Sequence, residues 1–301
     1  MIMKTMKLSM KALSLVLIGA SFIACGDDDE RKLPPIGGFD NADQVAAADL
    51  VAYWPLNGNG KEIKSNTDPS NTVGASYVEA IKGQGVNFTN GYLAYPEIAS
   101  LSASLPSMSI SLWAKVTNNG GDDGHPTMMF SLTRPNEWGG NINFMAETGW
   151  RPATADTLVV KGLAIIKTED GGANFQDIIN SANPSAEDIA NGHSAQPNKN
   201  GGQWAHYVLT WDATTAMFRL YANGVKISNP VWESRNGGNP LALNFFTPTR
   251  PVIGTFGSVA FGTPDSWQRP MNGQLDEIRV WKKVLTQAEI GALYELEKAG
   301  R

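Results

Sequence analysis

Apolar and polar residues alternate in several short stretches that are separated by turn residues, a pattern typical of strands buried on one face. In Ser109–Val116, every second residue from Ile110 onward is apolar. Asn223-Gly224 joins two such stretches and predicts a tight hairpin. The other predicted strands are Leu50–Trp54, Val86–Asn90, Tyr92–Tyr95, Trp204–Asp212, Met217–Ala222, Val225–Ile227 and Leu275–Trp281.

Helical signals are scarce and are concentrated at the C-terminal end. Thr286-Gln287-Ala288-Glu289 matches a capping box and predicts a short helix through about Leu296. Many short strands over ~250 residues predict an all-β fold, built as an antiparallel β-sandwich of two sheets.

The segment from Asn118 to Gly202 breaks the pattern. It contains four Gly-Gly pairs with many Asn and Asp residues between them, and only Leu158–Thr168 has the character of a strand. Long loops in a compact domain are usually functional or mobile. We therefore expect decorated loops along one edge or face of the sandwich.

The first residues have the features of a secretory signal. Three lysines precede the apolar stretch Ala12–Ile23, and the small residue Ala24 precedes Cys25. Phe22-Ile23-Ala24-Cys25 resembles a lipobox, in which the new N-terminal cysteine is acylated. We predict cleavage after residue 24 and a lipid on Cys25; the alternative is an ordinary signal with an incidental cysteine.

An acidic run, Asp27-Asp28-Asp29-Glu30, follows Cys25 directly. Adjacent carboxylates stay solvated and extended, so a plain tether explains them. The run also resembles the export signal of Bacteroidetes-type surface lipoproteins, which implies a lipid-anchored protein at the outer membrane and cell surface. With the breakers Pro34-Pro35 and Gly37-Gly38, residues 25–48 are predicted to be a tether and linker, and residues 49–301 the sandwich.

Composition excludes several classes of protein. One Cys allows neither an internal disulfide framework nor a cysteine-based zinc site, and a three-histidine metal centre would need all 3 His. The net charge of -5, which becomes -8 after removal of residues 1–24, argues against nucleic acid as a partner.

Four blocks, in order, resemble laminin G-like domains of bacterial type. They are Leu50–Gly60 (LVAYWPLNGNG), Ser109–Lys115 (SISLWAK), Trp204–Asp212 with Phe218–Gly224 (WAHYVLTWD and FRLYANG), and Gly273–Trp281 (GQLDEIRVW). The resemblance implies the concanavalin A-like lectin/glucanase superfamily and a jelly roll of two antiparallel sheets. Because that fold hosts lectins, hydrolases and adhesion modules, it does not settle function.

Hydrolases on this fold usually carry carboxylates spaced by two on one strand, so that they share a face. No predicted strand has such a pair, and Glu295 and Glu297, which have the spacing, lie at the end of the last helix. Glu147 near Trp150 is a lone candidate, and His206 is more typical of a satisfied core or surface histidine than of a base. We therefore expect no catalytic residues.

A structural calcium site is one explanation for Asp276. Strict alternation groups its carboxylate with Ile278 and Val280, away from Arg279, and an unpaired buried carboxylate is costly. Ca²⁺ would neutralise it, and the family resemblance implies the carbonyls of Pro55 and Gly91 as further ligands. The alternative, equally weighted, is that Asp276 caps a turn through backbone N–H groups.

Four of the 9 Trp lie in loops rich in Gly, Asn and Pro, with arginines nearby. An indole can stack on the apolar face of a sugar while polar groups bond its hydroxyls, although each Trp could simply pin its own loop. The candidate ligand-binding residues are Trp138, Trp150, Trp232, Trp267, Arg134 and Arg151.

Together these observations predict a lipid-anchored surface protein that binds carbohydrate without cleaving it. Its expected partners are a polysaccharide or glycan, the membrane through the lipid alone, and other surface proteins of glycan uptake. An adhesion module on the same fold is the alternative, and a glycoside hydrolase comes third. A concave cluster of exposed Trp with amide and carboxylate partners would indicate sugar, whereas a flatter apolar patch would indicate protein.

Overall fold

The computed structural model describes residues 33–180, 182–193 and 198–301. The predicted signal peptide, Cys25 and the acidic run lie outside these residues. The strands are β1 (Leu50–Trp54), β2 (Asn71–Glu79), β3 (Gln84–Ala94), β4 (Met108–Lys115), β5 (Thr127–Leu132), β6 (Ile142–Ala146), β7 (Val160–Lys167), β8 (Ala173–Ile179), β9 (Trp204–Asp212), β10 (Met217–Ala222), β11 (Val225–Lys226), β12 (Pro251–Ile253) and β13 (Met271–Trp281). The helices are η1 (Ala42–Gln44), η2 (Ala47–Asp49), α1 (Ala99–Ser102), η3 (Thr148–Trp150), α2 (Ala186–Ala190), η4 (Pro230–Trp232), η5 (Asn236–Gly238), α3 (Gly257–Phe261) and α4 (Gln287–Lys298).

All paired strands are antiparallel and form one curled sheet, in the order β11-β10-β9-β4-β13-β3-β12-β5-β6-β7-β8, with β1 on β13 and β2 on β3. The prediction of an antiparallel all-β fold is confirmed. The short strand β12 joins β3 to β5, so the two predicted layers are one hydrogen-bonded sheet that folds over on itself. Within the described residues, no helix is long and apolar enough to cross a membrane.

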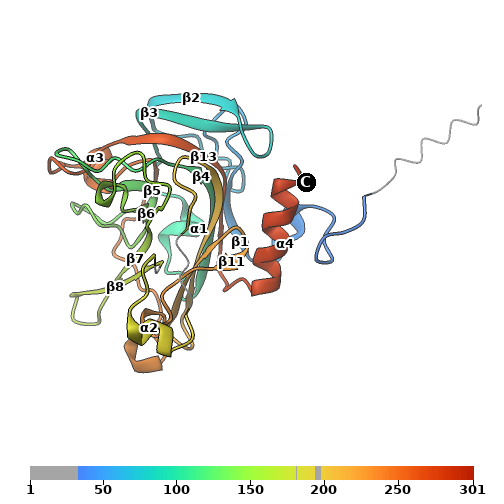
Figure 1. Cartoon of the computed structure of the whole chain (residues 1–301). Coiled ribbons are helices and arrows are strands. Elements are labelled where there is room, and N and C mark those ends of the chain that lie inside the picture. Colours follow the sequence, from blue (N-terminus) through green and yellow to red (C-terminus); the bar gives the residue numbers. More distant parts are fainter. Residues whose placement is uncertain (1–32, 181, 194–197) are drawn as a thin grey trace, which may run out of the picture. The chain divides into compact units, whose positions relative to one another are not determined.

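The two halves of the sheet enclose the main core (Figure 1). Gly162 on β7 shows how closely they approach, because a Cβ there would overlap the side chain of Leu209 on β9. Trp54 is fully buried between the halves and meets Tyr95 and Phe130 edge to face, with ring centroids 5.7 and 5.5 Å apart. These aromatic contacts add to the burial of apolar area that holds the layers together.

A second, smaller core lies on the outer face of the sheet, under α4 (Figure 1). The predicted capping box is present, since Thr286 and Glu289 bond each other's backbone N–H groups. Ala42 and Val45 are buried in this core, and the compact unit begins at Pro35. The segment that we expected to be linker as far as Ala48 is therefore folded from Pro35, because apolar residues in it cover α4.

The region between Asn118 and Gly202 contains more strand than the sequence pattern indicated. In addition to β7, it holds β5, β6 and β8. Every residue of β5 and β6 is buried, so neither strand shows the alternation of a strand with one wet face. The Asn90-Gly91 pair also does not end a strand: β3 runs through it, with Asn90 at φ 46°. At Asn223-Gly224, by contrast, both residues have positive φ and form the predicted hairpin turn between β10 and β11.

Candidate functional site

Two of the four loop tryptophans line one open cleft, together with Arg151. The cleft has a volume of about 410 Å³ and is bounded by η3, the end of β8, α2 and η4. We call it the indole cleft and define it by the residues Trp150, Arg151, Val159, Ile179, Asn180, Ala182, Asn183, Ser185, Glu187, Asp188, Asn229, Val231 and Trp232. The side chain of Trp150 is 61% exposed and that of Trp232 is 43% exposed, so both rings are accessible.

Backbone contacts hold each indole in place although its ring is exposed. Trp150 N–H donates to the carbonyl of Glu147 (3.2 Å), and Gly120 N–H donates to the carbonyl of Arg151 (2.7 Å). On the other wall, Asn229 caps η4 by accepting from the N–H of Val231 (3.1 Å). The rings therefore sit on loops that are fixed independently of any ligand, which reduces the entropy cost of binding.

The polar groups of the indole cleft differ in how far they are already engaged. Ser185 and Asp188 form the capping box of α2, and the N–H of Ser185 lowers the pKa of that carboxyl. In contrast, Glu187 and Asn183 are exposed, and the buried Nε of Arg151 has no hydrogen-bond partner among the described residues. Acceptors and donors thus remain available beside two aromatic faces.

The other two candidate tryptophans do not reach this cleft. Trp138 and Trp267 pack edge to face on each other (5.2 Å) and on Phe256, at 6.3 and 5.2 Å. Arg134 donates from Nε to the carbonyl of Gly139 (2.6 Å), and its guanidinium lies 5.1 Å from the ring of Phe246. These contacts pin long loops onto the sheet, the role that was the alternative for each Trp.

The predicted placement of Asp276 is wrong. A β-bulge between Asp276 and Arg279, with Glu277 at φ 49°, reverses the alternation, so that Asp276 pairs with Trp113 on the outer face. Asp276 accepts from the N–H groups of Ile81 (3.1 Å), Lys82 (3.0 Å) and Glu277 (2.9 Å). This is the turn-capping arrangement, in the turn between β2 and β3.

The calcium ligand set is not brought together. Pro55 follows Trp54, which pairs with Ile278, but Gly91 pairs with Met271. The part of β3 that lies beside Asp276 is near Val86, about 15 Å along the strand from Gly91. Among the described residues, no three His, Cys, Asp or Glu side chains cluster so as to hold a metal ion.

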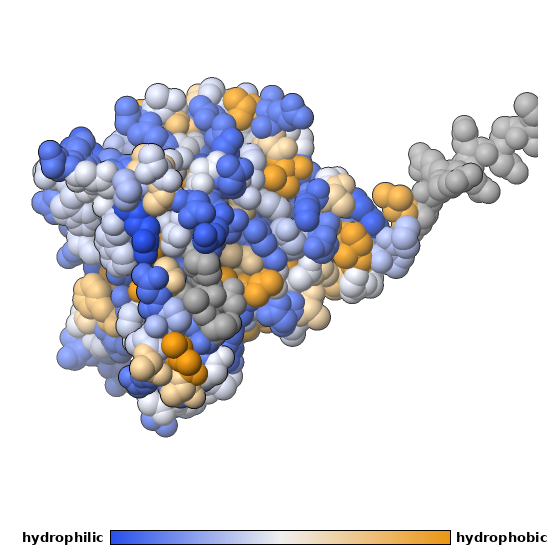
Figure 2. All heavy atoms as spheres, viewed as in Figure 1, coloured by the Kyte–Doolittle hydropathy of each residue, from blue (hydrophilic) through white to orange (hydrophobic). Residues whose placement is uncertain are grey.

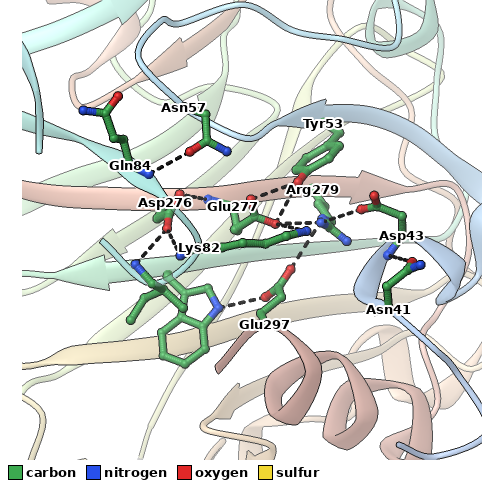
Figure 3. A network of polar contacts seen from close by, with 12 residues as sticks. Asn41, Asp43, Tyr53, Asn57, Lys82, Gln84, Asp276, Glu277, Arg279 and Glu297 are labelled. Atoms are coloured by element: carbon green, nitrogen blue, oxygen red, sulfur yellow. Dashed lines mark hydrogen bonds and ion pairs between the residues drawn. The ribbon is translucent and has the colours of Figure 1, made fainter. Parts of the chain in front are cut away.

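Buried charges do cluster in a different place, between the sheet and α4 (Figure 3). Arg279 is fully buried and donates to Glu277 Oε2 (2.6 Å) and Asp43 Oδ1 (2.9 Å), and its Nε lies 3.4 Å from Glu297 Oε1. Tyr53 donates its hydroxyl to Glu277 at 2.8 Å. We call these residues the Arg279 network.

Aromatic rings and an imidazole also contact the Arg279 network, through Glu297. Trp113 Nε1 donates to Glu297 Oε2 (2.8 Å), and the Trp113 ring stacks on Tyr294 of α4. His206 is buried, with its Nε2 2.8 Å from Ser111 Oγ. Burial and the nearby Arg279 charge lower the pKa of His206 to about 3, so the ring is neutral. These contacts join β4, β9 and β13 to α4, so this cluster fastens α4 to the sheet.

The fold also joins two carboxylates that strand spacing could not reveal. Lys161 Nζ lies 3.6 Å from Glu147 Oε1 and 3.3 Å from Asp177 Oδ2. Burial raises the pKa of Glu147. Lys161 pairs with Ile179, so the group sits beside a wall of the indole cleft. The carboxylates come from β8 and from the loop after β6, and no single-strand search could have found them.

A laminin G-type family model, described as the concanavalin A-like lectin/glucanases superfamily, matches residues 87–291. No curated protein matches the sequence. The binding domain of Paraclostridial Mosquitocidal Protein 1 is similar in structure, with a TM-score of 0.52 at 17% identity over 82% of this chain and 52% of that one. The botulinum neurotoxin serotype C1 binding domain has a TM-score of 0.52 at 13% identity over 84% and 53%. The chain spans about half the length of these structures, and the likeness shows the fold alone.

Proposed function

This chain belongs to the concanavalin A-like lectin/glucanases superfamily, and we propose that it binds carbohydrate without cleaving it, in the indole cleft. The observation that carries the proposal is the pair of exposed indoles of Trp150 and Trp232, which line one concave site on loops held by backbone hydrogen bonds. Flat aromatic faces stack on the C–H faces of sugar rings, which few other soluble ligands present together with many hydroxyls.

The polar lining supports the same ligand class. Glu187 and Asn183 offer acceptors to hydroxyl groups, and Arg151 offers donors. The volume, about 410 Å³, lies within the range of sites for small molecules, and it would hold a short stretch of saccharide.

The surface supports sugar over protein as the ligand. Figure 2 shows one face of the molecule, on which the described residues are mainly hydrophilic and the apolar ones form small, separate spots. An adhesion module would be expected to present a broader and flatter apolar patch. Adhesion stays the alternative on the same fold, to be favoured if no glycan binds.

A glycan array probed with the purified protein tests the proposal. We expect binding to a restricted set of saccharides and its loss in the double variant Trp150→Ala/Trp232→Ala. The matched control is Trp267→Ala, a loop tryptophan outside the cleft, which should keep wild-type specificity. An array on which the wild type and the double variant give the same pattern would sink the proposal.

Glycoside hydrolysis is the second candidate, and the Glu147–Lys161–Asp177 group is the observation that favours it. Two carboxylates that contact one ammonium group have a spacing compatible with the roughly 5–9.5 Å used by glycosidases. The raised pKa of Glu147 suits a general acid, although the Lys161 charge opposes it. Release of reducing ends from the bound saccharide by wild type, but not by Glu147→Gln, would establish this activity.

We also propose that Cys25 carries a lipid that holds the protein at the outer membrane and cell surface, as its sequence context predicts. Cys25→Ala should move the protein from the membrane fraction to the soluble fraction. Equal recovery of variant and wild type with membranes would contradict anchoring at this residue.

A further inference from the structure

A second cleft, lined by amide groups, shares no lining residue with the indole cleft or the Arg279 network. It has a volume of about 350 Å³. Its floor is a row of three side chains on neighbouring strands, because Gln274 of β13 pairs with Asn87 of β3 and with Lys115 of β4. The neighbours Val86, Ala114 and Leu275 face the core, so the row faces outward. We call this site the amide cleft.

Asn118 lines the amide cleft and carries a buried acceptor. Its side chain is only 2% exposed, and its Nδ2 donates to the carbonyls of Ala155 and Thr157, both at 2.9 Å. Since those carbonyls accept only, the amide orientation is fixed and Oδ1 points elsewhere. That Oδ1 is buried and receives no hydrogen bond from any described residue. A buried acceptor without a donor is unfavourable, and a ligand hydroxyl that donates to it would remove that penalty.

Hydrogen bonds also fix the orientation of the Gln274 amide and of the His125 ring. Gln274 Nε2 donates to Asn87 Oδ1 (3.2 Å), which leaves Gln274 Oε1 as an acceptor. His125 Nδ1 lies 2.7 Å from the carbonyl of Asp123 and must carry the proton, so Nε2 is the ring's remaining polar atom. The neighbouring amides Asn119 and Asn272 are tied to Thr148 and Asn90 and hold the surrounding loops.

The charge of the amide cleft is opposite to that of the whole chain. Its ionisable lining residues are Lys115 and His125, and no carboxylate is among them. Lys115 is exposed and forms no ion pair with a described residue. The whole chain has a net charge of -5, but the cleft has no carboxylate in its lining to repel an anion and has Lys115 to attract one. The indole cleft, in contrast, includes Glu187 and Asp188.

From these observations we propose that the amide cleft binds an acidic sugar, a saccharide residue that carries both hydroxyls and a carboxylate. The hydroxyls would donate to Asn118 Oδ1 and Gln274 Oε1, and the carboxylate would accept from Lys115. No Phe, Tyr or Trp side chain is among the lining residues, so recognition rests on hydrogen bonds and charge rather than on stacking. The inference does not depend on the indole cleft, and either site could exist without the other.

Calorimetric titration with oligogalacturonate, and with the same oligomer as its methyl ester, tests the proposal. The ester keeps the other hydroxyls and removes the charge, so wild type should bind it at least tenfold more weakly. Lys115→Ala should weaken acid binding to the level of the ester, and Lys115→Arg should restore it. Gln274→Met, which keeps the size of the side chain but removes its acceptor, should weaken both ligands.

The Trp150→Ala/Trp232→Ala double variant separates this proposal from the proposed function. If the amide cleft binds the acid, this variant keeps wild-type affinity for oligogalacturonate even where neutral glycan binding is lost. Loss of acid binding in the double variant would place the acid in the indole cleft and overturn the inference. Equal affinity for acid and ester, an unaffected Lys115→Ala variant, or no binding of oligogalacturonate by wild type would overturn it as well. Thermal melting of each variant confirms that it is folded.

Discussion

The Arg279 network and the indole cleft both gather charged and aromatic side chains, but they use them in opposite ways. In the network, Glu277 and Glu297 are fully buried, and each lies within ion-pair distance of the buried Arg279. In the cleft, by contrast, the rings of Trp150 and Trp232 are exposed. Charges buried beside their counterions indicate a structural role, whereas accessible aromatic faces that line a cleft indicate a place for a ligand.

The difference has an energetic basis. A buried charge is tolerated only when its partners stay in place, so losing one member leaves the others unpaired at a large cost. An exposed indole contributes little to the core and can be removed with little effect on folding. Variants in the two regions should therefore separate stability from binding, and the following experiments are ordered by the size of the effect that we expect.

Arg279→Met should produce the largest loss of stability. It leaves the carboxylates of Glu277 and Glu297 buried without their common partner, which costs about 3–5 kcal/mol. Chemical denaturation at pH 7 measures the change. The control is Lys61→Met, which breaks an exposed ion pair with Asp68 and should cost less than about 1 kcal/mol.

Equal stability of Arg279→Met and Lys61→Met would contradict this prediction, because the network would then not hold α4 in place. Glycan binding by the folded fraction of Arg279→Met should match wild type, as the indole cleft lies on other elements. A parallel loss of binding would show that the two regions are coupled.

His206 should make the network sensitive to acid. Its pKa is lowered to about 3 in the folded protein and is about 6.5 when unfolded, so the unfolded chain binds more protons between these values. The contribution of His206 to stability is therefore retained above pH 6.5 and is lost as the pH drops, by about 2 kcal/mol between pH 7 and pH 5. Denaturation of wild type and His206→Gln at both pH values measures it, and an equal loss in the variant would rule out His206 as the cause.

The sequence predicted the regular half of the molecule well because strands with one buried face alternate visibly. It failed where a local irregularity changed the period. The left-handed Glu277 inserts a bulge that moves Asp276 to the outer face, whereas Glu277 stays beside Arg279 as alternation predicts. The strands β5 and β6 were missed because both of their faces are covered, which leaves no alternation to detect.

The candidate site was predictable only in part. Gly- and Asn-rich context identified Trp138, Trp150, Trp232 and Trp267 as loop residues, and all four lie outside the regular strands. Which of them share a cleft depends on contacts such as the packing of Trp138 and Trp267 on Phe256. Such contacts join segments that are far apart in the sequence, and no local pattern records them.

Tryptophans inside and outside the indole cleft should differ in the same way, with smaller effects. Trp232→Ala should weaken glycan binding by about 1–3 kcal/mol, roughly ten- to hundredfold, with little change in melting temperature. Trp138→Ala should do the reverse, because it removes half-buried packing against Phe256 and Trp267, at a cost of about 2 kcal/mol of stability. Fluorescence titration measures the glycan affinity of both variants, and thermal melting measures their stability. The prediction is refuted if both variants lose the same property.

Calcium should have the smallest effect on either region. Both oxygens of Asp276 already accept backbone N–H groups, and the carbonyl of Gly91 belongs to a distant part of β3. A ligand that binds the folded state raises the melting temperature by mass action, so a chelator should lower it if Ca²⁺ is held. We expect equal melting temperatures in EDTA and in millimolar Ca²⁺. Asp276→Asn should melt below wild type in both, since it weakens a turn cap rather than a metal site. If Ca²⁺ raises the melting temperature of wild type but not that of Asp276→Asn, the calcium prediction is restored. The turn at Ile81 and Lys82 would then have to rearrange to admit the ion.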